Sequence, residues 1–200
     1  NLKIHAKICL IKRIVNKTTT HYGFVSTGNL NESTAKIYGD HCLLTSDRNI
    51  MADVNRIFHY LEQPKTRIQY LKACKTLMVC PTNMRRQLLQ LIAKEVREAK
   101  AGRPAAITLK MNSLSDEILI NQLYEAAKAG VEIKMVIRGI FCMLTENNKF
   151  KIPVQAISIV DEYLEHARIM IFHHGGFEKT FISSADWMVR NIDHRVEAAC

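Results

Sequence analysis

Two short stretches of the sequence place a basic residue two positions after a histidine. "NLKIHAKICL" contains His5 and Lys7, and "YLEHARIMIF" contains His166 and Arg168. An imidazole, with an unperturbed pKa of about 6.5, can attack phosphorus or carry a proton near neutral pH. A lysine or arginine beside it can hold the oxygens of a phosphate. The two pairs therefore indicate phosphoryl chemistry, with one histidine as nucleophile and the other moving a proton.

The sequence that follows each pair repeats as well. "IHAK" leads to "FVSTGN", and "EHAR" leads to "FISSAD", so each pair precedes a second extended segment ending in small hydroxyl residues and Asn or Asp. We interpret this as an internal duplication about a pseudo-twofold axis, which would bring both histidines to one phosphate. Because side chains alternate along a strand, we expect His5 and Lys7 to share one face.

The elements that must position these residues follow from hydrophobic spacing. Residues 1–30 read as two extended segments joined by a polar connection, "NKTTT". A helix is predicted over residues 49–64, ending at Pro64, and residues 62–74 read as a linker. The apolar positions of that helix are Ile50, Val54, Ile57, Phe58 and Leu61.

Beyond the linker, strands and helices alternate. "KTLMVCP", "AAITLKMN" and "VEIKMVIRG" are predicted strands, separated by amphipathic helices that end at Gly102 and Gly130, the second with Ser115 as N-cap. This order predicts an α/β fold with a parallel sheet. Polar groups then collect at the carboxyl ends of the strands, at Arg138, Lys110, Asn112 and Ser113. The last third is predicted to be strand-rich, with "HHGG" as a hairpin turn.

Composition limits the partners. The formal net charge of +9 favours a polyanion. No apolar run approaches the roughly 20 residues that span a bilayer, so no membrane segment is expected. Six scattered cysteines without a C-x-x-C pair predict reduced thiols, not a metal site. We therefore expect a cytoplasmic protein, with association to a membrane surface as an alternative.

Paired His-x-basic motifs followed by small hydroxyl residues resemble those of the phospholipase D superfamily, in which two such motifs supply two histidines to one phosphate. The hydrolases of that superfamily carry an Asp five places after the basic residue. Here those positions are Lys12 and His173. A phosphodiesterase of phospholipase D type is thus an alternative that the missing aspartates disfavour.

A narrower resemblance covers almost the whole chain. "STGNLN", "TAKIYGD", "ADVNRIFHYL", "KMNSLSDEILINQLYEAAKAGVEIKMVIRGI" and "ISSADWMVRNIDHRVE" resemble the C-terminal catalytic region of bacterial polyphosphate kinase. The resemblance implies an α/β fold of two phospholipase-D-like units with parallel or mixed sheets flanked by helices, over residues 1–72 and 73–200, both cut from larger domains. It implies reversible transfer of the terminal phosphate of ATP to inorganic polyphosphate through a phosphohistidine, with ATP/ADP and Mg²⁺ as cofactors.

The same resemblance suggests residue roles. His5 matches the histidine that is phosphorylated, and Tyr38, Arg138 and His166 match residues contacting the nucleotide and its phosphates, with His166 also catalytic. Lys7 and Arg168 are weaker phosphate-binding candidates, and no metal ligand is expected within this chain.

The resemblance also implies inorganic polyphosphate and nucleotide as partners, no nucleic acid, a homo-oligomer, and an excerpt inactive alone. A non-catalytic module that binds a polyanion remains the third interpretation.

Overall fold

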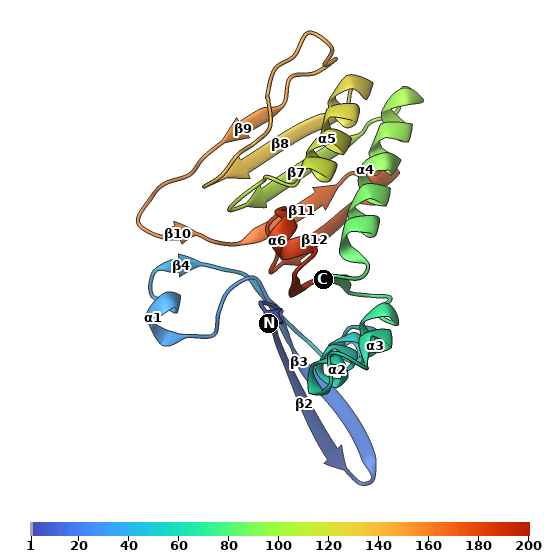
Figure 1. The fold of residues 1–200 in the computed structure, drawn as a ribbon, viewed down its shortest axis with the longest axis vertical. Helices are drawn as coiled ribbons and strands as arrows, with labels where there is room; N and C mark the ends of the chain where they lie inside the picture. The colour runs from blue at the N-terminus through green and yellow to red at the C-terminus, as the bar shows by residue number, and fades with distance from the viewer. Residues whose placement is uncertain (1) are drawn as a thin grey trace.

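The computed structural model describes residues 2–200 and shows a mixed α/β fold, as predicted (Figure 1). One large sheet has the strand order β1-β13-β12-β11-β7-β8-β9, and β6 pairs with β13 off this path. The strands are β1 (Lys3–Ile4), β6 (Met78–Cys80), β7 (Ala106–Met111), β8 (Glu132–Ile137), β9 (Gln155–Ile157), β11 (Arg168–Phe172), β12 (Lys179–Ser183) and β13 (Arg195–Ala199).

Only part of this sheet is parallel. β7, β8 and β9 run parallel, but β11 is antiparallel to both β7 and β12. β6 does not join β7 as the alternating pattern predicted, because it pairs antiparallel with β13. The hairpin predicted at "HHGG" is confirmed: β11 and β12 are joined through the short helix η1 (His174–Gly176).

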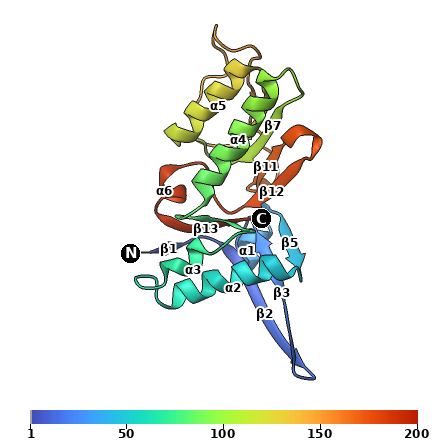
Figure 2. The same cartoon turned by 90° about the vertical axis from the view of Figure 1, so that its right-hand side faces the viewer.

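Two amphipathic helices pack beside the sheet, α4 (Met84–Lys100) and α5 (Glu117–Ala129) (Figures 1 and 2). Gly102 and Gly130 follow their ends with φ of 71° and 98°, the left-handed region that glycine adopts without a Cβ clash. The predicted N-cap of α5 is wrong by one residue. Asp116, not Ser115, caps the helix, and its carboxylate accepts the backbone N–H of Leu119.

The first part of the chain forms a separate three-stranded sheet of β2 (Lys7–Val15), β3 (Thr18–Ser26) and β5 (Cys42–Thr45). In Figure 1 the β2–β3 hairpin projects away from the large sheet. Its turn is only Asn16 and Lys17, with φ of 48° and 63°, so the predicted "NKTTT" connection is too long. The short helix α1 (Glu32–Ala35) follows, and β4 (Tyr38–Gly39) pairs in parallel with β10 (Leu164–Glu165).

Helix α2 (Arg48–Glu62) confirms the helix predicted before Pro64, although Phe58 is exposed instead of buried. The predicted linker is partly helical, because α3 (Ile68–Lys72) lies within it and buries Leu71. The short helix α6 (Val189–Ile192) precedes β13.

Strands β6 and β13 form a wall between two hydrophobic cores. Met78 and Cys80 belong to the core under α4 and α5, whereas Val79 packs with α2 and α3. Val196 and Ala198 of β13 likewise pack on the α2 side. Alternating strand side chains therefore join the two parts of the molecule through one buried layer.

All six cysteines are free thiols, as the sequence predicted. Among the helices of residues 2–200, none combines the length and the apolar character that a bilayer crossing requires.

Candidate active site

His5 lies where the chain leaves the large sheet and enters the small one. The backbone N–H groups of His5 and Ala6 both donate to the carbonyl of Val196, each at 2.9 Å. His5 thus sits between β1 and β2, so the predicted continuous strand is interrupted at the histidine. The imidazole Nδ1 lies 2.9 Å from the carboxylate of Glu197, which is fully buried.

His166 lies in the same local structure at the end of β10. The N–H groups of His166 and Ala167 both donate to the carbonyl of Gly39, at 3.2 and 3.0 Å. The imidazole Nδ1 lies 2.9 Å from the carboxylate of Asp40. That carboxylate also accepts the hydroxyl of Thr27 at 2.6 Å, and Glu197 correspondingly accepts the hydroxyl of Ser184.

The strands after each histidine confirm the internal duplication. Lys7 pairs across the ladder with Ser26, and Arg168 pairs with Ser183. In both repeats the serine hydroxyl accepts the backbone N–H two residues later, from Gly28 at 3.2 Å and from Ala185 at 3.0 Å.

The repeats exchange their carboxylates. Asp40 belongs to the first repeat and holds His166 of the second, whereas Glu197 belongs to the second repeat and holds His5 of the first. Each histidine is therefore oriented by the opposite repeat. A hydrogen-bonded carboxylate at Nδ1 fixes the tautomer and the orientation of an imidazole, so both rings are held in place from the Nδ1 side.

The basic residues break this symmetry. Arg168 is buried and donates to Asp186, to the carbonyl of Thr27 at 3.3 Å and to Nε2 of His166 at 2.9 Å. Asp186 also accepts two backbone N–H groups. The position that corresponds to Asp186 in the first repeat is Asn29, and Nζ of Lys7 is buried with no hydrogen-bond partner among the described residues. Unlike Arg168, Lys7 therefore forms neither a hydrogen bond nor an ion pair through Nζ among residues 2–200.

These contacts assign different states to the two histidines. A guanidinium can only donate, so Nε2 of His166 accepts from Arg168 and its Nδ1–H donates to Asp40. The lone pair of Nε2 is thereby engaged in His166. For His5, the described contacts of the ring involve Nδ1 alone.

The ionisation of the surrounding groups follows from burial and these contacts. Burial lowers the pKa of Lys7 to about 8, against the opposing pull of Glu197. Burial acts to raise the pKa of Asp40. The hydrogen bonds from His166 and Thr27 act in the opposite direction and outweigh burial, so the pKa of Asp40 is lowered. Burial likewise opposes ionisation of Asp186, and the charge and hydrogen bonds of Arg168 outweigh it to lower its pKa. Both carboxylates are therefore ionised at neutral pH.

Lys7 connects the two half-sites. Its ammonium interacts electrostatically with Glu197 of one half and with Arg168 and Asp40 of the other. The charge state of Lys7 is therefore coupled to both histidine–carboxylate pairs. Arg168 spans the same junction through its bond to Thr27.

Tyr38 and Arg138 lie on the His166 side. The rings of Tyr38 and His166 are 4.9 Å apart. Arg138 donates from Nε and NH2 to the side-chain oxygen of Asn112, at 3.1 and 2.8 Å, and Asn112 donates to the carbonyl of His166 at 3.4 Å. Two strand-end residues predicted to lie together, Arg138 and Asn112, are thus in contact.

A hollow opens on the same side, lined in part by residues that precede Tyr38 and His166 in the chain, including the carboxylates of Asp161, Glu162 and Glu165. Arg138, Ile37 and Tyr163 line it. Lys110, another predicted strand-end residue, donates to the carbonyl of Ala167 and forms an ion pair with Glu165 at 2.9 Å.

The described residues do not build a metal site. Within residues 2–200, no three His, Cys, Asp or Glu side chains are grouped as metal ligands. The carboxylates beside the two histidines are already engaged by imidazole, hydroxyl, amide or guanidinium groups. These donors do not fit a Mg²⁺ ion, which requires free carboxylate oxygens or substrate phosphates.

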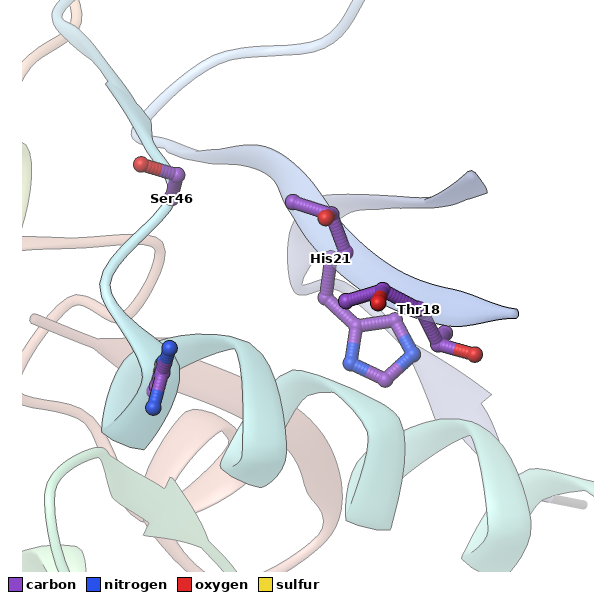
Figure 3. Close-up of a pocket in the computed structure, with 6 residues that line it drawn as sticks. Thr18, His21 and Ser46 are labelled. Carbon is purple, nitrogen blue, oxygen red and sulfur yellow. The ribbon is translucent and has the colours of Figure 1, made fainter. Parts of the chain in front are cut away.

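A separate hollow, shown in Figure 3, lies where β3 passes the start of α2. Thr18–His21 line it from the strand, with Ser46 and Arg48 on the facing segment. None of the residues predicted from the sequence to form the site lines this hollow.

Sequence reasoning missed the carboxylates Asp40 and Glu197 and the hydroxyls Thr27 and Ser184. The spacing of the repeat could have located the two carboxylates. Asp40 follows Ser26 by the same number of residues by which Glu197 follows Ser183. The repeat was recognised only as far as "STGN" and "SSAD". Extending it by one further strand finds both acids.

Comparison with known proteins agrees with this geometry. Residues 1–67 match the family model "Polyphosphate kinase C-terminal domain 1", and residues 77–200 match "Polyphosphate kinase C-terminal domain 2". The chain is 43% identical over 198 residues to the polyphosphate kinase of Escherichia coli K12 and 44% identical over 196 residues to that of Vibrio cholerae. These alignments include 99% and 98% of the chain but only 28% and 27% of the relatives.

A solved structure is similar over the whole chain. The crystal structure of polyphosphate kinase from Porphyromonas gingivalis covers 100% of this chain and 30% of its own, with 41% identity and a TM-score of 0.89. The chain therefore spans little more than a quarter of its curated relatives, and it belongs to the polyphosphate kinase family.

Proposed function

We propose that this chain carries the phosphoryl-transfer site of an ATP:polyphosphate phosphotransferase, with His5 as the nucleophile. The observation that carries the proposal is the asymmetry between two otherwise equivalent half-sites. His5 is oriented through Nδ1, and Nζ of the neighbouring Lys7 has no hydrogen-bond partner among the described residues, whereas Nε2 of His166 is engaged by Arg168. An attacking nitrogen needs a free lone pair, and the incoming phosphate needs a cation.

In the first step, Nε2 of His5 attacks the terminal phosphorus of ATP. The N–P bond forms as the bond from phosphorus to the bridging oxygen breaks, and the electron pair leaves with ADP. The ring keeps its proton on Nδ1 and becomes positively charged, and the carboxylate of Glu197 at 2.9 Å stabilises that charge. Lys7 neutralises the oxygens of the transferring phosphoryl group.

In the second step, a terminal oxygen of polyphosphate attacks the same phosphorus and the N–P bond returns its electrons to Nε2. Both steps replace one phosphoanhydride or phosphoramidate bond by another, so the sequence is reversible. His166 contacts the phosphates from the opposite side and assists transfer of charge or protons, with Asp40 and Arg168 holding its ring. Tyr38 and Arg138 contact the nucleotide on the His166 side, where the rings of Tyr38 and His166 are 4.9 Å apart.

The proposed mechanism includes no step on a protein-bound magnesium ion, because the described side chains around the two histidines do not form a set of Mg²⁺ ligands. When bound to the nucleotide, Mg²⁺ supplies charge neutralisation of the phosphates.

The test is phosphorylation of the full-length protein that carries this chain. Incubation with γ-labelled ATP is expected to give an acid-labile, base-stable label that is absent from His5→Ala. The exposed residue His194 provides the matched control, and His194→Ala is expected to label normally. Label retained by His5→Ala, or no label on the wild-type protein, would refute the assignment. Hydrolysis of a phosphodiester without consumption of ATP would instead support the phospholipase-D-type alternative.

Glu197→Gln tests the orientation of the nucleophile. Gln keeps the shape but not the charge, so we expect the rate of labelling to fall by about 10² or more, by analogy with loss of the carboxylate from a histidine-containing triad. Glu178→Gln, an exposed change outside the site, is expected to leave the labelling rate unchanged. Equal rates for Glu197→Gln and wild type would show that the carboxylate does not act on His5.

A further inference from the structure

A basic groove lies at the end of the β11–β12 hairpin that is remote from Arg168 and Ser183. One face of α4 forms its first wall and the hairpin forms the second, and Figure 2 shows this helix running beside the hairpin. The cations that line it are Lys75, Lys94, Arg97 and Lys179. None of the residues lining this groove is an aspartate or glutamate.

Most of this charge is not neutralised. Lys75, Arg97 and Lys179 are exposed and form no ion pair among residues 2–200, while Lys94 pairs with Glu98. Glu98 is nearly buried and also pairs with Arg103, so one carboxylate serves two cations. The groove therefore carries an excess of positive charge that no described side chain offsets.

The other nearby carboxylate has a structural task. Glu95 is fully buried and accepts the backbone N–H groups of Ala106 and His174. The second of these bonds, at 2.6 Å, supports His174 at a φ of 51°, which few residues other than glycine adopt. Glu95 thus fixes the hairpin wall of the groove, and it forms no ion pair with the groove cations among the described residues.

The dimensions and the remaining lining suit an extended anion. The groove follows α4 from Gln87 to Arg97, which corresponds to about 15 Å of helix at 1.5 Å per residue. Gln87, Gln90 and Thr76 add amide and hydroxyl donors. The half-buried Phe181 packs edge-on against Phe172, with 6.4 Å between ring centroids, so this aromatic ring is part of the core and not a free stacking platform for bases.

We propose that this groove binds a stretch of inorganic polyphosphate outside the active site. The choice of polyphosphate over other polyanions rests on the proposed function. Strand β12 links the groove to the site: Lys179 begins the strand and Ser183 ends it, about 13 Å away at 3.3 Å per residue. A long chain held in the groove stays near the site between transfers, whereas a short chain does not gain from the groove.

The test compares two double variants of the full-length protein with equal loss of charge. Arg97→Gln with Lys179→Gln removes two groove cations, and Lys100→Gln with Lys149→Gln removes two exposed cations outside it. We expect the groove variant to bind long-chain polyphosphate at least fivefold more weakly than wild type. Its affinity should also depend less steeply on salt, because fewer phosphate contacts release fewer counterions. The control variant is expected to stay within twofold of wild type.

Chain length separates the groove from the active site. Binding of tripolyphosphate, which occupies only a few phosphate positions, and labelling of His5 from ATP are both expected to be unchanged in the groove variant. Equal weakening in both double variants would mean general charge attraction and would overturn the proposal. The proposal would also be overturned if the groove variant bound long-chain polyphosphate as tightly as wild type. It would be overturned as well if the groove variant lost binding to RNA but kept binding to polyphosphate. If wild type fails to label, the proposed function fails, but direct binding of polyphosphate still tests the groove.

Discussion

Lys7 and Arg168 occupy equivalent positions in the two repeats, yet one neighbouring residue gives them different roles. Asp186 neutralises Arg168, whereas the corresponding Asn29 carries no charge. Arg168 therefore orders the second half-site around His166 and the carbonyl of Thr27, and Lys7 remains available to an anion. The two had been predicted as similar phosphate-binding candidates, because the sequence shows the basic residues but not which of them already has a counter-ion.

The lowered pKa of Lys7 predicts a pH dependence. In the free protein the ammonium is charged below about pH 8 and is lost as the pH rises through that value. Affinity for tripolyphosphate should therefore be full below pH 8 and decline above it, by up to about tenfold per pH unit for one linked proton. Titration calorimetry from pH 7 to 10 measures this.

Arginine stays charged over that range, so Lys7→Arg provides the control. We expect its affinity to lack the decline above pH 8. If Lys7→Arg and wild type show the same pH profile, another group controls the binding of phosphate. The same shift also affects folding. Burying the charged lysine destabilises the folded state below about pH 8, and this cost disappears as the pH rises from about 8 to the ordinary value of 10.5, where the unfolded chain binds more protons than the folded one.

At the scale of elements, long periodic segments were predictable and short ones were not. Helices α2, α4 and α5 carry clear apolar spacing, and the sequence located them to within a few residues. Strands β1, β4 and β10 have two residues each, too few for any alternation to appear, yet they hold His5 and His166 in place. Their pairing depends on residues far apart in the chain, which local pattern cannot supply.

The predicted linker shows a second limit of local pattern. Residues 62–74 are polar enough to read as a connection, but Leu71 of α3 is buried in the same hydrophobic core as the apolar face of α2. The carboxylate of Asp53, fully buried on α2, accepts the backbone N–H groups of Lys75, Thr76 and Leu77 at 2.9, 2.7 and 2.9 Å. One side chain of α2 thus holds the backbone of the segment between α3 and β6 in place.

Replacing that side chain should destabilise the fold. Asp53→Ala leaves three backbone donors without an acceptor, and we expect the free energy of unfolding to fall by about 3 kcal/mol or more. Urea denaturation followed by circular dichroism measures the change. Asp161→Ala, at an exposed loop position, is the matched control and should change the free energy of unfolding by less than about 0.5 kcal/mol. A similarly small effect of Asp53→Ala would show that the three bonds do not stabilise this junction.

At the scale of the whole molecule, the exchanged carboxylates make the two repeats one functional unit. His5 depends on β13 of the second repeat, and His166 depends on the segment after β4 of the first. The wall formed by β6 and β13 packs against both cores, so a change in the packing of either core reaches Glu197. The duplication was visible in the sequence, but the exchange between repeats was not, since equivalent residues in a repeat do not reveal which copy they contact.

This exchange predicts energetic coupling across the repeats. Asp40 acts through His166, so Asp40→Asn alone should lower the rate of phosphoryl transfer from ATP to polyphosphate. When His166→Ala is already present, Asp40→Asn should lower the rate of phosphoryl transfer by less than twofold, because the ring that Asp40 orients is absent. Arg138 does not contact Asp40 and reaches His166 only through Asn112, so the losses from Asp40→Asn and Arg138→Gln should come much closer to multiplying. Steady-state rates of the wild type, the two single variants and the double variant in each cycle measure both. Multiplying losses for Asp40 and His166 would mean that the carboxylate acts on another group, and the crosswise orientation of the histidines would then not govern catalysis.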